Sequence, residues 1–138
     1  MYTKDVYLSV TIHMADKIKI LIVEDEEMLS TMYKVKFEND GYTVYTATNG
    51  AEGIELAVKD QPNLILLDII MPKIDGFAVL KKLKEDPKTK GIPVILLTNL
   101  GQDEDISRGK ELGAAGYLIK ANNTPSEVVA KVKQYIKK

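Results

Sequence analysis

The sequence that decides the fold reads Leu64-Ile65-Leu66-Leu67-Asp68 and continues, after two isoleucines, as Met71-Pro72-Lys73-Ile74-Asp75-Gly76. Four consecutive apolar residues bounded by turn residues are typical of a fully buried strand. Asp68 ends this run, and a strand that buries itself rarely ends in a carboxylate without a reason. We therefore interpret Asp68 as a functional residue at the end of a central strand.

Two other apolar runs also end in polar side chains. Residues 18–23 stop at Glu24 and Asp25, and residues 94–97 stop at Thr98. The carboxyl ends of parallel strands line one edge of a sheet, where ligands bind, so these side chains are predicted to meet. Like charges about 4 Å apart repel by roughly 4 kcal/mol at an effective dielectric constant of about 20, and a bound cation is the simplest compensation.

From Lys17 onward, strand-like runs alternate with segments of helical period. This alternation predicts an α/β fold with a parallel sheet. The five predicted strands are residues 18–23, 43–47, 64–67, 93–97 and 116–119.

Helices are predicted between and after these strands. The first predicted helix ends at Asp40-Gly41 and includes Met28, Leu29, Met32, Val35 and Lys36. The second begins at about residue 50 and ends just before Pro62. The third covers residues 76–84 and has Phe77, Leu80 and Leu83 on one face. The fourth opens at Asp103-Glu104-Asp105, and Gly109 weakens its interior. The last begins at Thr124-Pro125 with Glu127 completing a capping box, and its buried stripe is Val128, Val129, Val132 and Ile136.

Residues 1–16 stand outside this alternation of strands and helices. Their apolar residues alternate with polar ones, as they would in a half-buried strand. Two interpretations stay open: an N-terminal extension outside the core, or an extra edge strand or dimer arm.

Composition excludes several classes of protein. The 138 residues suit one domain, and the absence of Cys excludes thiolate zinc sites and redox motifs. With 19 basic and 20 acidic residues, no charge bias favours nucleic acid or an anionic membrane. No apolar run is long enough to cross a bilayer and no signal peptide is evident, so we expect a cytoplasmic protein with no membrane insertion and no direct nucleic-acid partner.

Four motifs occur in order along the chain: Lys19 to Glu26, Leu67 to Gly76, Leu97-Thr98 and Gly113 to Lys120. Together they resemble the receiver domain of bacterial two-component response regulators, of the single-domain CheY-like kind. The resemblance covers about residues 17–138. It implies a flavodoxin-like, doubly wound five-stranded sheet of order 2-1-3-4-5 with helices on both faces.

The resemblance also implies a chemistry. Asp68 is expected to accept a phosphoryl group from a histidine kinase or a histidine phosphotransfer protein, through an aspartyl phosphate. Glu24, Asp25, Asp68 and the backbone carbonyl of Ile70 are the expected ligands of Mg²⁺, a hard cation that prefers oxygen.

Three further residues complete the site that the resemblance implies. Lys120 is expected to pair with one phosphoryl oxygen and Thr98 to donate its hydroxyl to another. Movement of Thr98 then lets Tyr117 turn inward, which changes the surface of the fourth helix, fifth strand and fifth helix. We expect no output domain after the fifth helix, so the signal is expected to leave through an unidentified partner protein, with no enzymatic activity beyond self-phosphorylation and slow autodephosphorylation.

Simpler interpretations exist for these residues taken singly. Asp25 could be only a helix N-cap, Thr98 a strand-end hydroxyl bonded to nearby backbone, Tyr117 core packing and Lys120 a solvated strand end. Asp75-Gly76 is interpreted as turn chemistry that starts the third helix and not as a ligand.

The chain departs from the family pattern at three positions. Glu24 stands where many members have Asp, and its longer side chain favours binding the ion through water. Asn99 replaces the usual small residue after Thr98 and is expected to reduce access of water or small phosphodonors. Ala121 replaces a common Pro after Lys120, which removes the rigid turn that helps to place the Lys.

Other functions compete with the phosphorylated switch. A phosphate-independent binding module with the same fold would be favoured by loss of Asp68 or Lys120, but both are present. An aspartyl-phosphate phosphatase would need a second Asp two residues beyond Asp68, where Ile70 stands. A nucleotide-binding module is disfavoured because neither G-x-G-x-x-G nor the P-loop pattern occurs.

Overall fold

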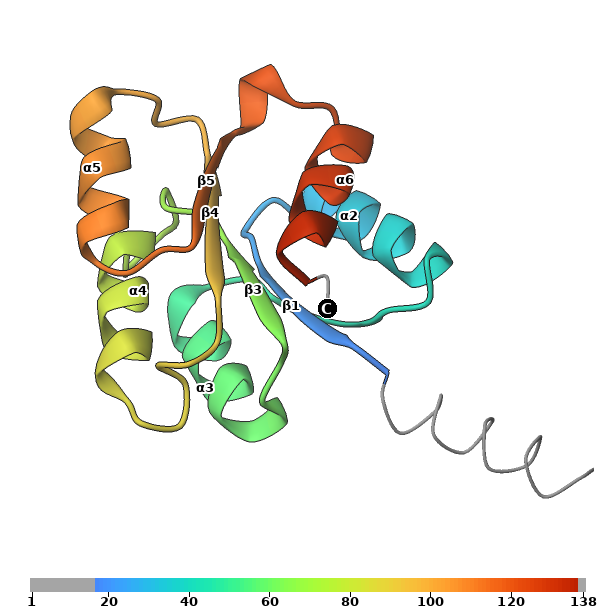
Figure 1. Cartoon of the computed structure of the whole chain (residues 1–138), viewed down its shortest axis with the longest axis horizontal. Helices are drawn as coiled ribbons and strands as arrows, with labels where there is room; N and C mark the ends of the chain where they lie inside the picture. Colours follow the sequence, from blue (N-terminus) through green and yellow to red (C-terminus); the bar gives the residue numbers. More distant parts are fainter. Residues whose placement is uncertain (1–16, 137–138) are drawn as a thin grey trace, which may run out of the picture.

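The computed structural model describes residues 17–136. The interpretations of residues 1–16 given above lie outside the described residues. The elements follow one another along the chain as five alternations of strand and helix (Figure 1). They are β1 Lys19–Val23, α2 Glu27–Asn39, β2 Thr43–Ala47, α3 Gly50–Asp60, β3 Leu64–Leu67, α4 Gly76–Glu85, β4 Val94–Thr98, α5 Asp103–Glu111, β5 Gly116–Ile119, the short 3₁₀ helix η1 Lys120–Asn122 and α6 Pro125–Ile136.

The strands form one parallel sheet in the order β2-β1-β3-β4-β5. This confirms the predicted fold and strand order. The observed strand limits agree with the predicted ones to within one residue. One of these differences concerns a site residue, because Thr98 is the last residue of β4 and not the first residue after it.

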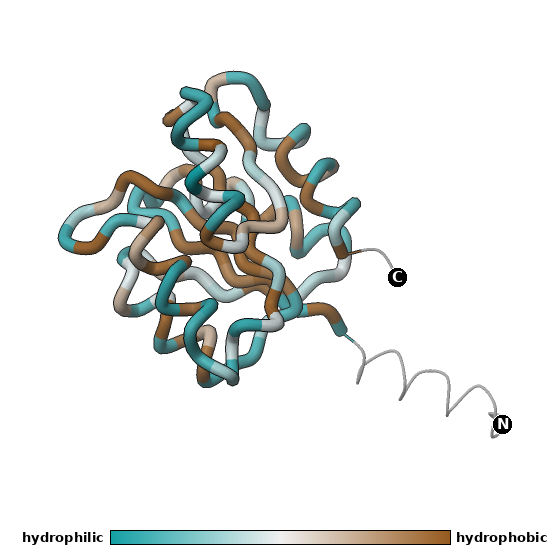
Figure 2. The backbone as a smooth tube through the Cα atoms, turned by 60° about the vertical axis from the view of Figure 1, so that its left-hand side comes forward, coloured by the Kyte–Doolittle hydropathy of each residue, from teal (hydrophilic) through white to brown (hydrophobic). Residues whose placement is uncertain are grey.

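Helices cover both faces of the sheet because its buried residues alternate in direction. On one face, Leu21, Ile65 and Leu96 pack with α3 and α4. On the other face, Ile22, Leu66 and Ile95 pack with α2 and α6. Figure 1 shows α3, α4 and α5 on one side and α2 and α6 on the other, and Figure 2 shows the hydrophobic strands running through the centre.

The helix α2 forms where predicted, and the structure shows which of its residues face inward. Ser30, Tyr33 and Phe37 are its buried residues. Met28, Met32 and Val35 are 79%, 40% and 48% exposed. The two large aromatic side chains lie one turn apart and set the inward face, which leaves these apolar residues on the outside.

In α4 and α6 the predicted caps form, and the predicted inner faces are buried except for Ile136, which is half-buried. Phe77, Leu80 and Leu83 of α4 are buried, and Asp75 accepts a hydrogen bond from the Ala78 amide as the N-cap. At α6, Thr124 Oγ1 accepts from the Glu127 amide (3.1 Å) while Glu127 accepts from the Thr124 amide (2.8 Å), which is the predicted capping box.

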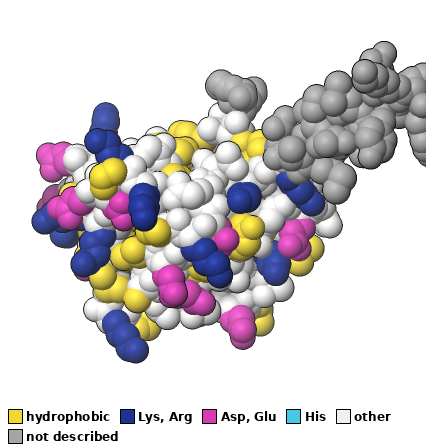
Figure 3. Space-filling view, turned by 90° about the horizontal axis from the view of Figure 1, so that it is seen from below, with side chains coloured by type: hydrophobic (Ala, Val, Ile, Leu, Met, Phe, Trp, Pro, Cys, Tyr) yellow, Lys and Arg dark blue, Asp and Glu magenta, His cyan; other side chains and the backbone are white. Residues whose placement is uncertain are grey.

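The surface is mixed in charge on the face that Figure 3 presents, where basic and acidic side chains are interspersed. Within residues 17–136, no helix combines the length and the apolar character needed to cross a membrane.

Candidate functional site

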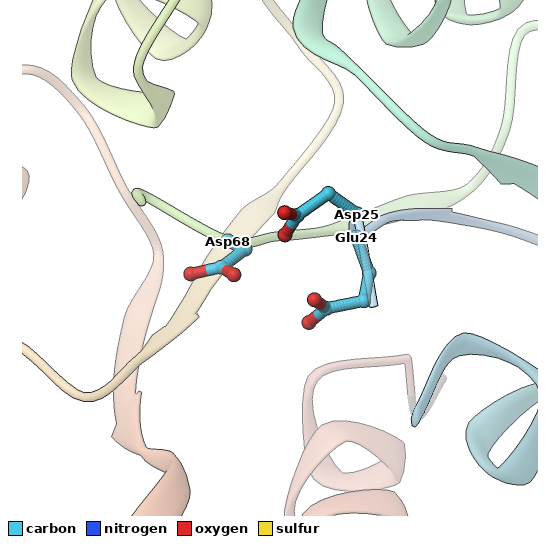
Figure 4. Close-up of side chains that lie close together, drawn as sticks. All are labelled: Glu24, Asp25 and Asp68. Atoms are coloured by element: carbon cyan, nitrogen blue, oxygen red, sulfur yellow. The ribbon is translucent and has the colours of Figure 1, made fainter. Parts of the chain in front are cut away.

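The strand ends bring the predicted acidic residues together. The Asp68 amide donates to the Val23 carbonyl (3.0 Å) and the Glu24 amide donates to the Ala47 carbonyl (3.0 Å), so the ladder of the sheet fixes both backbones. Glu24, Asp25 and Asp68 each offer a carboxylate oxygen within 4.8 Å of the others. In Figure 4 the three carboxylates point toward a common space.

Lys120 joins two of these carboxylates. Its Nζ lies 2.8 Å from Glu24 Oε1 and 2.9 Å from Asp68 Oδ2, and the three side chains are only 11%, 2% and 5% exposed. A third acidic residue, Glu26, lies 3.6 Å from the same nitrogen but is largely exposed. Lys120 is therefore a largely buried partner of the acidic cluster and not a solvated strand end.

The remaining oxygens of the two buried carboxylates are bound by backbone amides. Glu24 Oε2 accepts from the Glu26 amide (2.9 Å), and Asp68 Oδ1 accepts from the Ile70 amide at 3.3 Å. Asp25 is exposed. The N-cap position of α2 is Glu26 and not Asp25, so the N-cap interpretation of Asp25 is wrong.

Burial changes the acid–base properties of this cluster. Removal from water raises the pKa of Glu24 above its ordinary value, and the hydrogen bond from Lys120 offsets part of that rise. Burial alone would lower the pKa of Lys120, but its hydrogen bonds to Glu24 and Asp68 outweigh burial and raise it. The Lys120 ammonium therefore stays charged at neutral pH.

A pocket of ≈ 240 Å³ opens beside the cluster. It is lined by Asp25, Glu26, Asp68, Ile70, Thr98, Asn99 and Lys120. Thr98 is fully buried, and its Oγ1 accepts from the Leu100 amide at 3.4 Å. Thr98 thus makes the backbone contact of a strand-end hydroxyl and also lines the pocket next to Asp68.

Tyr117 lies on β5. Its hydroxyl donates to the Leu100 carbonyl at 2.6 Å, two residues after Thr98. Burial, with a smaller effect of the Asp105 carboxylate, raises the pKa of Tyr117 to about 12. Tyr117 therefore holds its proton at neutral pH and connects β5 to the loop that follows Thr98.

The sequence analysis named Gly76 and Asn99 but did not predict the contacts by which they contribute to the site. The close approach at Gly76 positions Asp68, since a Cβ there would lie against the Asp68 carbonyl oxygen and 2.5 Å from the Ile69 Cα. The Gly76 amide also donates to the Ile69 carbonyl (2.7 Å). The other is Asn99, whose Oδ1 accepts from the Ala121 amide at 3.0 Å; its only signal in the sequence is its departure from the family pattern.

The site can hold a divalent cation. Glu24, Asp25 and Asp68 carry three negative charges when ionised, and Lys120 supplies one positive charge against them. Two negative charges stay uncompensated within the cluster. The side-chain groups that could bind an ion are all carboxylate oxygens, which are the ligands that Mg²⁺ prefers.

Comparison with known proteins gives one consistent family. The model of the response regulator receiver domain matches residues 20–133. The DNA-binding dual master transcriptional regulator RpaA of Synechocystis sp. is 40% identical over 120 residues, which are 87% of this chain and 49% of that protein. Response regulator PleD of Caulobacter vibrioides is 42% identical over 102 residues, 74% of this chain and 22% of that protein. The chain thus spans about half the length of RpaA and less of PleD.

Solved structures agree with these relatives. A CheY-like receiver domain protein from Methanospirillum hungatei has a TM-score of 0.81 at 27% identity, covering 88% of this chain and 94% of that one. The chemotaxis protein CheY4 of Vibrio cholerae has a TM-score of 0.80 at 29% identity, covering 86% of this chain and 98% of that one.

Proposed function

The chain belongs to the family of response regulator receiver domains, and on this premise we propose that it accepts a phosphoryl group on Asp68 from a phosphohistidine of a kinase or phosphotransfer protein. We also propose that this domain extends over residues 17–138. One observation carries the proposal: Asp68 lines an open pocket while its carboxylate is held 2.9 Å from the Lys120 ammonium.

The reaction needs an aligned carboxylate and neutralised phosphoryl oxygens. An Asp68 oxygen attacks phosphorus, the P–N bond of the phosphohistidine breaks, and the imidazole nitrogen keeps the electron pair. Lys120 then pairs with one phosphoryl oxygen. The Thr98 hydroxyl leaves the Leu100 amide and donates a hydrogen bond to a second phosphoryl oxygen. The domain needs no further enzymatic activity beyond this transfer and a slow hydrolysis of the product.

Mg²⁺ is the proposed cofactor, and Glu24, Asp25, Asp68 and the Ile70 carbonyl are its proposed ligands. The acidic cluster and its uncompensated charge support this assignment. When bound, the ion supplies positive charge to the phosphoryl oxygens that Lys120 and Thr98 do not reach. Ile70 lines the pocket, and its amide already contacts Asp68.

The proposed switch runs from Thr98 to Tyr117. A phosphoryl group adds about −1.5 to −2 charges near neutral pH, which draws the Thr98 hydroxyl toward it. The bond from the Tyr117 hydroxyl to Leu100 supports the connection, because it ties β5 to the residue after Asn99. Such couplings are typically about 1 to 3 kcal/mol, so phosphorylation shifts a population toward an altered surface of α5, β5 and α6.

The output is proposed to be contact with another protein. RpaA is described as DNA-binding, but the shared residues cover only about half of it. The near balance of 19 basic and 20 acidic residues supports a protein partner over direct contact with nucleic acid.

The proposal is tested by intact mass after incubation with acetyl phosphate, with and without Mg²⁺, and then with a phosphorylated histidine kinase. We expect the gain of one phosphoryl group that requires Mg²⁺ and is lost in Asp68→Asn. Asp75→Asn is the matched control, because it removes an exposed carboxylate nearby while its amide oxygen can still cap α4. A gain that persists in Asp68→Asn would overturn the assignment.

Failure with both donors would favour the second candidate, a binding module of the same fold that works without phosphate. Failure with acetyl phosphate alone would agree with the predicted effect of Asn99 on access to the pocket.

A further inference from the structure

The position of the Lys120 ammonium depends on the turn that follows it. Lys120 comes directly after the last residue of β5 and is the first residue of the short 3₁₀ helix η1. Its side chain must reach back to Glu24 and Asp68, which follow β1 and β3. A shift of this turn would therefore displace the ammonium from both carboxylates.

The last pair in the register of β4 and β5 is Thr98 with Ile119. Directly after the end of β4, the Asn99 side chain reaches the turn that follows β5. Its Oδ1 accepts from the Ala121 amide at 3.0 Å, a contact between residues 22 apart in the sequence. We call this contact the Asn99–Ala121 bridge.

The bridge needs the residue types found at both ends. An alanine at position 99 has no side-chain oxygen to offer, and a proline at position 121 has no amide hydrogen to donate. The two departures from the family pattern noted after Thr98 and after Lys120 are thus the two halves of one hydrogen bond. Among the described residues, the peptide bonds of this turn are all trans.

Other side chains hold the same turn. Asn123 Nδ2 donates to the Ile119 carbonyl at 2.8 Å, and Asn123 Oδ1 accepts from Lys131 Nζ at 2.6 Å. These contacts fix the side of the turn that faces α6. The Asn99–Ala121 bridge fixes the side that faces the pocket, which Asn99 and Lys120 both line.

We propose that Asn99 is a positioning residue, whose bridge to the Ala121 amide holds the Lys120 ammonium against Asp68 in place of a proline turn. Because Asn99 directly follows Thr98, the bridge also links the threonine to the lysine across the pocket. The role in phosphoryl transfer rests on the proposed function, but the role in placing Lys120 does not.

The first test measures the bridge without phosphoryl chemistry. We expect hydrogen exchange at the Ala121 amide, followed by NMR, to be slow in the natural chain and about tenfold faster or more in Asn99→Ala. Asn99→Asp keeps an acceptor oxygen and is expected to restore protection. The matched control is Asn122→Ala, since Asn122 is exposed in the same turn and makes no side-chain hydrogen bond within residues 17–136.

The second test follows the Lys120 ammonium by ¹⁵N NMR in the same variants. We expect its signal to shift in Asn99→Ala and to stay unchanged in Asn122→Ala. The proposal would be overturned if the Ala121 amide of the natural chain exchanged as fast as an unprotected amide. It would also be overturned if the Lys120 ammonium signal did not change in Asn99→Ala.

The third test connects the bridge to the reaction. With a phosphorylated histidine kinase as the donor, to which the predicted effect of Asn99 on small-donor access does not apply, the rate of Asp68 phosphorylation should fall about two- to tenfold in Asn99→Ala, the effect of one net hydrogen bond. In Ala121→Pro, which lacks the donor, the same change at Asn99 should have no further effect. Equal losses in both backgrounds would show that Asn99 acts without the bridge. If the natural chain accepts no phosphoryl group, the proposed function fails, and the two NMR tests still decide whether Asn99 places Lys120.

Discussion

Lys120 contributes more to the site than charge alone. Its ammonium is the only partner, among the salt bridges of the described residues, that Glu24 and Asp68 share. The other close ion pair of comparable length joins Lys133 to Asp40 at 2.9 Å on the surface, with both side chains about two-fifths exposed. The two lysines therefore allow a comparison of a buried with an exposed pair.

Substitution of Lys120 by Met is expected to lower the free energy of unfolding by about 3 to 5 kcal/mol at neutral pH. The reason is that removal of one partner leaves two buried carboxylates uncompensated. The loss should shrink as the pH falls, because the pKa of Glu24 is raised in the folded protein and its protonated form is favoured there. Urea unfolding at several pH values measures both effects.

The matched control is Lys133→Met. Its ion pair is exposed to water, so we expect no measurable change in stability. Equal losses in the two variants would mean that burial does not set the strength of the Lys120 cluster.

At the scale of the element, the first residue of α4, Gly76, packs against the backbone of Asp68 and Ile69. The Gly76 amide bonds to the Ile69 carbonyl, and its Cα faces the backbone of Asp68 and Ile69. The helix α5 approaches the sheet in a similar way, since a Cβ at Gly109 would lie 2.6 Å from Leu96 Cδ1. Gly109 is the only buried residue of α5. The glycine that weakens this helix is thus also its point of contact with β4.

Substitution of Gly76 by Ala is expected to lower the free energy of unfolding by about 1 to 3 kcal/mol and to slow phosphorylation of Asp68. The added Cβ meets backbone atoms, which cannot rotate away, so the strand end itself must move. Urea unfolding gives the stability, and intact mass against time gives the rate.

Gly91→Ala provides the comparison for Gly76→Ala. Gly91 has nothing within 4 Å of an added Cβ, and its φ lies outside the left-handed region. Its substitution should change stability by less than about 0.5 kcal/mol and leave the rate unchanged. A Gly76→Ala variant with natural stability and natural rate would contradict the packing argument.

At the scale of the whole molecule, the parallel sheet gathers the ends of β1, β3, β4 and β5 at one edge (Figure 1). The helices α3 and α4 pack on one face of the sheet and α2 and α6 on the other, and the pocket beside Asp68 opens at this edge. The acidic cluster at that edge opposes folding through charge repulsion, so a cation that binds only the folded chain should stabilise the whole molecule.

We expect Mg²⁺ to raise the free energy of unfolding by about 2.7 kcal/mol at a concentration one hundred times its dissociation constant, which is the effect of mass action on a single site. Asp25→Asn should lose most of this gain but keep the stability of the metal-free chain, because Asp25 is exposed and has no ion pair among the described residues. Urea unfolding with Mg²⁺ or with a chelator measures both quantities.

Asp75→Asn, which changes an exposed carboxylate outside the pocket lining, should respond to Mg²⁺ like the natural chain. If Mg²⁺ stabilised Asp25→Asn as strongly as the natural chain, the ion would bind elsewhere.

The sequence by itself determined the strands, the strand order through the family resemblance, and the residues that meet at the sheet edge. These features depend on local apolar runs, on caps such as Thr124 with Glu127, and on the rule that parallel strands end at one edge. Only the tertiary structure decided which face α2 buries, how closely Gly76 approaches Asp68, and that Asn99 binds the Ala121 amide. Each of these depends on distances between residues far apart in the chain, and packing and strand register set those distances where local sequence preference does not.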